Sequence, residues 1–96
     1  MSFSIQAIED INRIEKAAKE KMNCTAERWL DIAYALDYIS FSEKENISAL
    51  IKKYNECKAQ NIDPHFSKKN AKDLFDVREI VVNTIFPESC LKALGL

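Results

Sequence analysis

The sequence predicts an all-α protein, a compact bundle of four to five helices, from three observations. Apolar residues recur at steps of three and four along most of the chain, which is the period of an amphipathic helix. The chain has a single glycine, Gly95, and two prolines, so it holds few of the residues that β-hairpin turns favour. Capping signals and a proline break separate the periodic segments. Because 96 residues suffice for one hydrophobic core, we expect a single helical domain over residues 1–96.

The first two predicted helices differ in how much of their surface is apolar. The segment from about residue 4 to residue 22 carries an isoleucine-rich stripe that drifts around the helix, because several of its steps are three residues long. The segment from about residue 25 to residue 40 begins at Thr25, a residue type that caps free amides at helix N-termini. Apolar side chains on several faces then follow, and we expect this helix either to be the centre of the bundle or to expose an apolar surface.

Two further helices are predicted from capping and from the spacing of charges. Ser42 and Glu45 have the spacing of a capping box, which indicates a helix that begins there and fades near residue 59. The residue before Pro64 is pushed out of helical geometry, so a break is expected at residues 61–64. From about residue 67 to residue 86, charged residues at helical steps predict a helix despite the β-branched run at 80–82. Residues 88–94 are long enough for one or two terminal turns.

Two segments resemble parts of known helical families. Residues 70–74 resemble the start of a helix-turn-helix, but Phe75 stands where that motif has glycine and Asp76 where it has an apolar residue. A continuous helix is therefore the prediction for this segment. Residues 29–64 are a predicted helical hairpin whose end, residues 54–64, resembles the second helix of a pentatricopeptide-type repeat. The hairpin covers a third of the chain and occurs once. Stacked repeats need several copies to bury their faces, so neither resemblance assigns the chain to a family.

Motifs that carry catalytic or cofactor chemistry are absent from the sequence. It contains no glycine-rich phosphate loop, no Cys-x-x-Cys pair, no calcium loop and no helical histidine pair. His65 follows Cys57 by eight residues, which allows a thiol–imidazole dyad, but no group that would orient it can be identified. Acidic residues at helical spacing are interpreted as solvated faces: Glu27 with Asp31, and Asp73 with Asp76 and Glu79. We expect no catalytic residue, no cofactor, no metal and no enzyme activity.

The cysteines and the hydropathy pattern indicate a reducing, aqueous compartment. Cys24, Cys57 and Cys90 are odd in number and no signal segment leads the chain, which favours free thiols over a disulfide framework. The apolar stretches are far shorter than the roughly 20 residues that cross a bilayer. We therefore expect a cytoplasmic protein without a membrane partner.

The leading function hypothesis is a small protein-protein interaction module, of the adaptor, chaperone, immunity or inhibitor-type regulator kind. It would present an exposed apolar helical face to another protein or to a second copy of itself, as in a dimer. The candidate partner-binding residues are Trp29, Tyr34, Tyr38 and Phe41, because amphipathic aromatic side chains tolerate both burial and water. No small-molecule substrate is expected.

A small nucleic-acid-binding regulator is the alternative hypothesis. Lysines outnumber acidic residues between positions 52 and 72, and a cluster of cations can attract phosphates. The candidate nucleic-acid-binding residues are Lys52, Lys53, Lys68, Lys69 and Lys72. No arginine interleaves them, and the net charge of the chain is −1, so this partner is less favoured than a protein.

Overall fold

The computed structural model describes residues 3–84, 86–93 and 95, and over these ranges it contains helices and no strand. The helices are α1 (Phe3–Met22), α2 (Ala26–Ala35), α3 (Phe41–Ala59), α4 (Lys68–Asn83) and the short α5 (Glu88–Ala93). The predicted all-α bundle of four to five helices is thereby confirmed.

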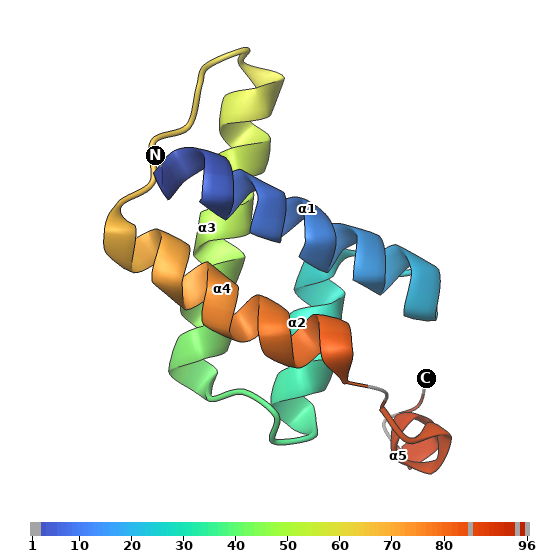
Figure 1. The fold of residues 1–96 in the computed structure, drawn as a ribbon. Helices are drawn as coiled ribbons and strands as arrows, with labels where there is room; N and C mark the ends of the chain where they lie inside the picture. The colour runs from blue at the N-terminus through green and yellow to red at the C-terminus, as the bar shows by residue number, and fades with distance from the viewer. Residues whose placement is uncertain (1–2, 85, 94, 96) are drawn as a thin grey trace.

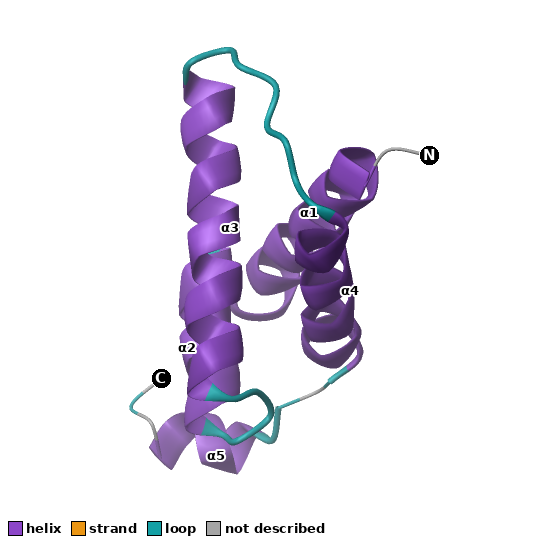
Figure 2. Ribbon diagram, turned by 90° about the vertical axis from the view of Figure 1, so that its left-hand side faces the viewer, coloured by secondary structure: helices purple, strands orange, loops and turns teal. Residues whose placement is uncertain are grey.

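The four long helices form two crossed layers. α1 and α4 lie side by side and run in the same direction, so that their starts meet at one end of the pair (Figure 1). α2 and α3 form an antiparallel hairpin that crosses this pair, and the two layers separate clearly in the turned view (Figure 2). α1 and α4 make the most extensive contact, while α2 touches α1, α3 and α4. α4 likewise touches the three other long helices, so α2 and α4 share the central position of the bundle.

The core lies between the layers and buries one face of each long helix. Its largest fully buried side chains come from all four of these helices and from the α3–α4 connector: Trp29, Phe66, Ile11, Ile14, Leu30, Ile47, Ile51, Leu74, Val77 and Val81. Trp29 donates its indole N–H to the carbonyl of Val81, at 3.2 Å. That carbonyl belongs to the last turn of α4, where no amide of the helix is available to it. The indole therefore fastens α2 to the end of α4.

α2 ends at Ala35, about five residues before its predicted end. Asp37 adopts a left-handed conformation, with φ of 63°, directly after the helix. The amide of Asp37 donates to the carbonyl of Tyr34 at 3.0 Å, and the amide of Tyr38 donates to that of Ala33 at 2.9 Å, which is the Schellman pattern of helix termination. Glycine is the usual residue at this position, and aspartate adopts the conformation at a higher cost. Because no glycine marks this turn in the sequence, the predicted helix extended beyond the observed end of α2.

α3 begins two residues before the predicted capping box, so the assignment of Ser42 as its cap was wrong. Ser40 is the N-cap: its hydroxyl accepts a hydrogen bond from the Glu43 amide at 3.1 Å, and the Glu43 carboxylate accepts one from the Ser40 amide at 2.9 Å. The sequence holds two overlapping Ser-x-x-Glu patterns, Ser40 to Glu43 and Ser42 to Glu45. The early turn at Asp37 brings the chain into extended geometry at Ser40, which selects the first pattern.

α4 is continuous through Phe75 and Asp76, as predicted in place of a helix-turn-helix. It starts after the N-cap Ser67, whose hydroxyl accepts a hydrogen bond from the Asn70 amide at 3.1 Å. It ends at Asn83, three residues before the predicted end; Ile85, which was expected in this helix, lies outside the described residues.

Candidate interaction site

Three aromatic side chains stand exposed where α2 ends and α3 begins. Tyr34, Tyr38 and Phe41 are 39%, 39% and 54% exposed. Tyr34 belongs to the last turn of α2, Tyr38 to the turn, and Phe41 is the first residue of α3, so the chain reversal gathers them within eight residues. We call these three residues the aromatic surface.

Trp29, the fourth residue expected at a partner interface, belongs to the core instead. Its side chain is only 1% exposed, and its polar atom is already satisfied by Val81. It cannot contact a partner without unfolding of α2. The prediction of Trp29 as a partner-binding residue was therefore wrong, because its ring fills the core between α2 and α4.

The rings of the aromatic surface are held by other rings. Tyr34 and Phe41 meet edge to face, with centroids 5.7 Å apart. Tyr38 packs on Phe86 at 4.9 Å, and Phe86 packs in turn on Trp29 at 4.6 Å. Each such pair contributes about 0.5–1.5 kcal/mol beyond burial. Tyr38 is thus the outer end of a stack that reaches the core through Phe86, whereas Tyr34 and Phe41 pack on each other.

The charges around the aromatic surface are predominantly negative. Lys44 lies 5.1 Å and 5.0 Å from the ring centroids of Tyr34 and Phe41, and its ammonium is 3.6 Å from the carboxylate of Asp31. Its positive charge is therefore already matched by an anion. Asp37, beside Tyr38, and Glu45, one helical turn after Phe41, are both exposed. Neither makes an ion pair with a described residue, so they give the aromatic surface an acidic rim.

The lysines proposed for nucleic acid are largely engaged within the protein. Lys69 pairs with Asp73 at 3.2 Å, and Lys72 pairs with Asp76 at 2.8 Å. Lys53 donates to the backbone carbonyl of His65 at 2.6 Å and lies over the ring of Phe66. Lys52 and Lys68 are exposed and make no ion pair within the described part of the chain. Phe66 is buried, so it is not available for stacking on a base.

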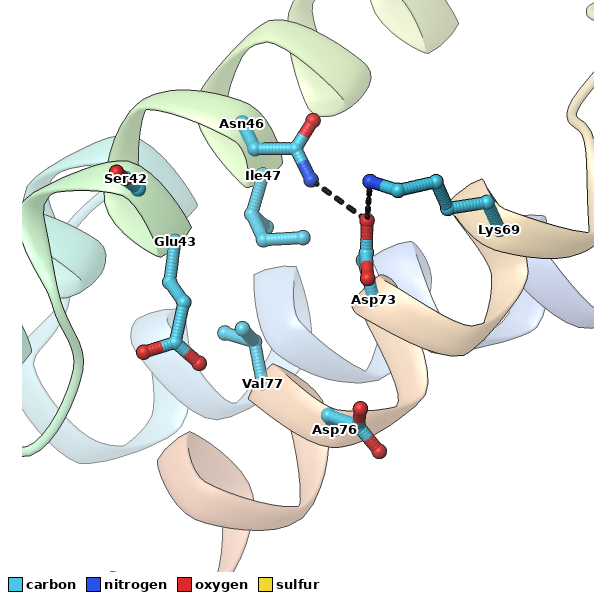
Figure 3. A pocket seen from close by; sticks show the side chains of 8 residues that line it. All are labelled: Ser42, Glu43, Asn46, Ile47, Lys69, Asp73, Asp76 and Val77. Carbon is cyan, nitrogen blue, oxygen red and sulfur yellow. Dashed lines mark hydrogen bonds and ion pairs between the residues drawn. The ribbon is translucent and has the colours of Figure 1, made fainter.

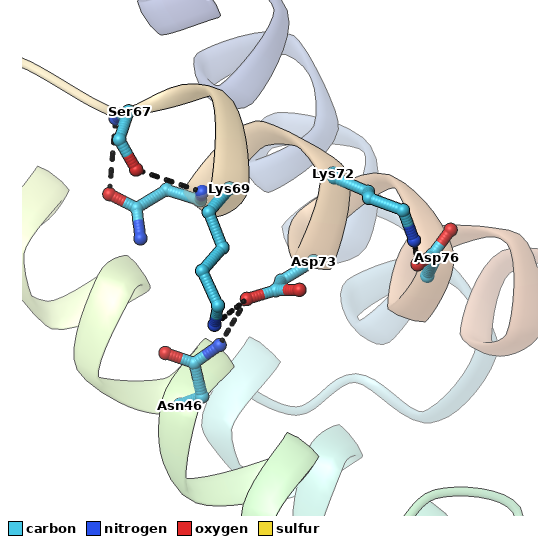
Figure 4. A network of polar contacts seen from close by, with 7 residues as sticks. Asn46, Ser67, Lys69, Lys72, Asp73 and Asp76 are labelled. Atoms are coloured by element: carbon cyan, nitrogen blue, oxygen red, sulfur yellow. Dashed lines mark hydrogen bonds and ion pairs between the residues drawn. The ribbon is translucent and has the colours of Figure 1, made fainter.

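Asp73 sits at the centre of a polar network between α3 and α4. One of its carboxylate oxygens accepts hydrogen bonds from the side-chain amide of Asn46, at 2.9 Å, and from the ammonium of Lys69 (Figure 4). The network borders a hollow of about 260 Å³ that Glu43 and Asp76 also line (Figure 3). In that view the three carboxylates do not converge on one point. The described residues hold no cluster suited to a metal ion.

A buried ion pair between α1 and α4 was missing from the sequence-based picture. A carboxylate oxygen of Asp10 lies 2.9 Å from Nε of Arg78, and the two side chains are 3% and 13% exposed. The N–H is not aligned for a hydrogen bond, and the second Asp10 oxygen has no partner among the described residues. Burial raises the pKa of Asp10 above its ordinary value, against the opposing effect of Arg78.

The cysteines and the histidine do not form a site in the described structure. Cys57 is half-buried in α3, His65 is exposed in the connector, and no hydrogen bond joins them there. Burial raises the pKa of the Cys24 thiol, which donates to the carbonyl of Ala18. A raised pKa keeps this thiol protonated at neutral pH and lowers its reactivity. The side chain of Cys90 lies outside the described residues.

The chain matches no protein-family model, no curated protein and no solved structure. No described helix is both long enough and apolar enough to cross a membrane.

Proposed function

We propose that this protein is a non-catalytic, cytoplasmic interaction module that binds another protein through the aromatic surface formed by Tyr34, Tyr38 and Phe41. The observation that carries the proposal is that three exposed rings lie within one chain reversal, with Tyr34 and Phe41 in contact and Tyr38 packed on Phe86. Exposed apolar residues scattered singly need no explanation, whereas a contiguous group on a small protein marks an interaction site.

The order of these rings favours binding. Side chains that must be immobilised on association cost about 0.5–1.5 kcal/mol each. Tyr38 rests on Phe86, and Tyr34 and Phe41 rest on each other and on Lys44, so much of this ordering is complete in the free protein. Tyrosine is also among the residues that most often dominate the binding energy of interfaces.

The acidic rim specifies the chemistry of the partner. Asp37 and Glu45 would repel an acidic protein and attract a basic one. The fitting partner is therefore a protein surface that presents apolar side chains beside lysine or arginine. Nucleic acid fits this surface poorly, because the acidic rim repels phosphates. The lysine-rich region stays the alternative site for nucleic acid, with two of its five lysines, Lys69 and Lys72, paired to carboxylates.

The test is a capture experiment with matched variants. The tagged protein, its Phe41→Ser variant and its Ile62→Ser variant are each incubated with lysate of the source cells, and the retained proteins are quantified by mass spectrometry. Ile62 lies in the α3–α4 connector and is 53% exposed, against 54% for Phe41, so the two changes remove apolar side chains of similar fractional exposure from different places. We expect a protein that the original chain and Ile62→Ser both retain, and that Phe41→Ser retains at least tenfold less, about 1.4 kcal/mol of binding. Equal retention by both variants would contradict the proposal.

A further inference from the structure

A second apolar surface lies far from the first, where α1 and α4 begin side by side (Figure 1). It is a groove of about 280 Å³ lined by Phe3, Gln6, Lys68, Ala71, Lys72 and Phe75. Phe3 and Phe75 form exposed walls, and Ala71 is buried. The small side chain of Ala71 leaves the space between the two rings open.

The rim of this groove is basic. Lys68 and Lys72 line it, and no carboxylate does. Lys72 is balanced by Asp76, but Lys68 makes no ion pair with any residue of the described ranges. As the first residue of α4, Lys68 also stands at the end of the helix where unpaired amides add positive potential. The groove therefore suits an apolar surface that carries negative charge.

One surface of that chemistry is present on the same molecule. The aromatic surface exposes rings beside the unpaired carboxylates of Asp37 and Glu45, while the groove exposes rings beside Lys68. We propose that the groove binds the aromatic surface of a second copy of this chain, in a head-to-tail contact; this rests on the proposed function of the aromatic surface. The complementarity is twofold, because apolar surface meets apolar surface and the acidic rim meets the basic one.

A head-to-tail contact has a consequence that a symmetric dimer lacks. The two surfaces are different, so each associated pair keeps one unused aromatic surface and one unused groove. Further copies can add at both ends, and the mean mass must rise with concentration beyond that of a dimer. The two surfaces lie on different layers, α2 and α3 against α1 and α4, so one copy cannot satisfy both of its own surfaces.

Sedimentation equilibrium with two complementary variants tests the contact. Phe41→Ser removes the aromatic surface and keeps the groove, while Phe3→Ser with Lys68→Glu removes the groove and keeps the aromatic surface. Glutamate at position 68 suits the start of α4, so the fold should persist. We expect the original chain to grow in mass up to about 1 mM, each variant alone to stay monomeric, and an equimolar mixture to form a dimer that grows no further. A symmetric contact would instead leave one variant dimeric by itself, which would overturn the proposal.

Charge reversal tests the rim. Glu45→Lys should weaken self-association roughly fivefold, and adding Lys68→Glu to the same chain should restore it, since the two reversed charges attract again. If Lys68→Glu added to Glu45→Lys does not restore association, the proposed attraction between Glu45 and Lys68 of neighbouring copies is wrong. If the original chain stays monomeric up to about 1 mM, the proposed self-association is wrong. That result would also be obtained if the groove binds an acidic peptide in place of a second copy. The capture experiment with Phe41→Ser is independent of this result and decides the proposed function separately.

Discussion

Replacing Arg78 with methionine would leave the Asp10 carboxylate buried between α1 and α4 without its counter-ion. The two groups are 2.9 Å apart and almost fully covered. At an effective dielectric constant of about 20, unit charges at this distance attract by about 6 kcal/mol. Removing each ion from water costs several kcal/mol, so the intact pair is worth little net stability. In the variant, the Asp10 carboxylate is still removed from water but is no longer attracted by Arg78. We expect the free energy of unfolding to fall by about 3–5 kcal/mol.

Urea denaturation followed by fluorescence measures this effect directly. Trp29 is the single tryptophan and is buried against Phe86, so its emission reports unfolding of the core. The control is the double variant Asp10→Leu with Arg78→Met, which removes both charges and fills the space with apolar groups. It should be within about 1 kcal/mol of the original protein, or more stable. A loss below about 0.5 kcal/mol in Arg78→Met, or a double variant as unstable as the single one, would refute the reasoning.

The same pair predicts a pH dependence of stability. Because burial raises the pKa of Asp10 above 3.8, the folded state holds this proton more tightly than the unfolded state does. The contribution of Asp10 to the free energy of unfolding is therefore full below pH 3.8 and is lost as the pH rises through the raised pKa. Relative to Asp10→Asn, the original protein should gain stability as the pH falls from about 7 to about 4. If the stability of the original protein relative to Asp10→Asn stays constant or decreases as the pH is lowered from about 7 to about 4, the raised pKa of Asp10 is contradicted.

Four substitutions test the local structure of α2 and of the turn and cap that follow it. Asp37→Gly should stabilise the protein by about 0.5–1 kcal/mol in thermal denaturation, because glycine adopts the left-handed conformation without strain; a lower melting temperature would argue against the turn. Ser40→Ala should cost about 1 kcal/mol, whereas Ser42→Ala should change stability by less than about 0.5 kcal/mol, and the reverse order would restore the cap predicted from sequence. Trp29→Phe should cost about 2–4 kcal/mol by circular dichroism, since it leaves the Val81 carbonyl without its donor and opens a cavity; a neutral result would place the indole outside the core.

The helices themselves were predictable because the hydrophobic period depends only on residue type and spacing. Charges at helical steps correctly favoured a helix over the β-branched run of α4, whereas Trp29 was expected at an exposed interface and is buried. The boundaries near residues 35–41 were not predictable in the same way. There, an aspartate adopts the left-handed conformation for which glycine is the usual residue, and two overlapping Ser-x-x-Glu patterns were both compatible with a helix start.

Two core residues escaped the sequence analysis for different reasons. Asp10 follows Ala7 by three residues and precedes Ile14 by four, which is the spacing of the buried face of α1. Because charged side chains are usually exposed to solvent, the sequence did not indicate its burial. Only the fold brings Arg78 opposite it. Phe66 stands alone in the α3–α4 connector, where no period exists to mark it as buried. Its burial depends on tertiary contacts, including the hydrogen bond from its amide to the Ser4 hydroxyl at 2.8 Å.

Site-specific photo-crosslinking in living cells tests the central claim, that the aromatic surface binds a protein, most directly. A benzophenone amino acid replaces Phe41 in one chain and Ile62 in another, so that a reactive ring stands at two positions of matched exposure. We predict that irradiation links position 41 to a protein, whether a second copy or another chain, and that position 62 gives no comparable adduct. Equal adducts at both positions, or none at position 41, would contradict the account.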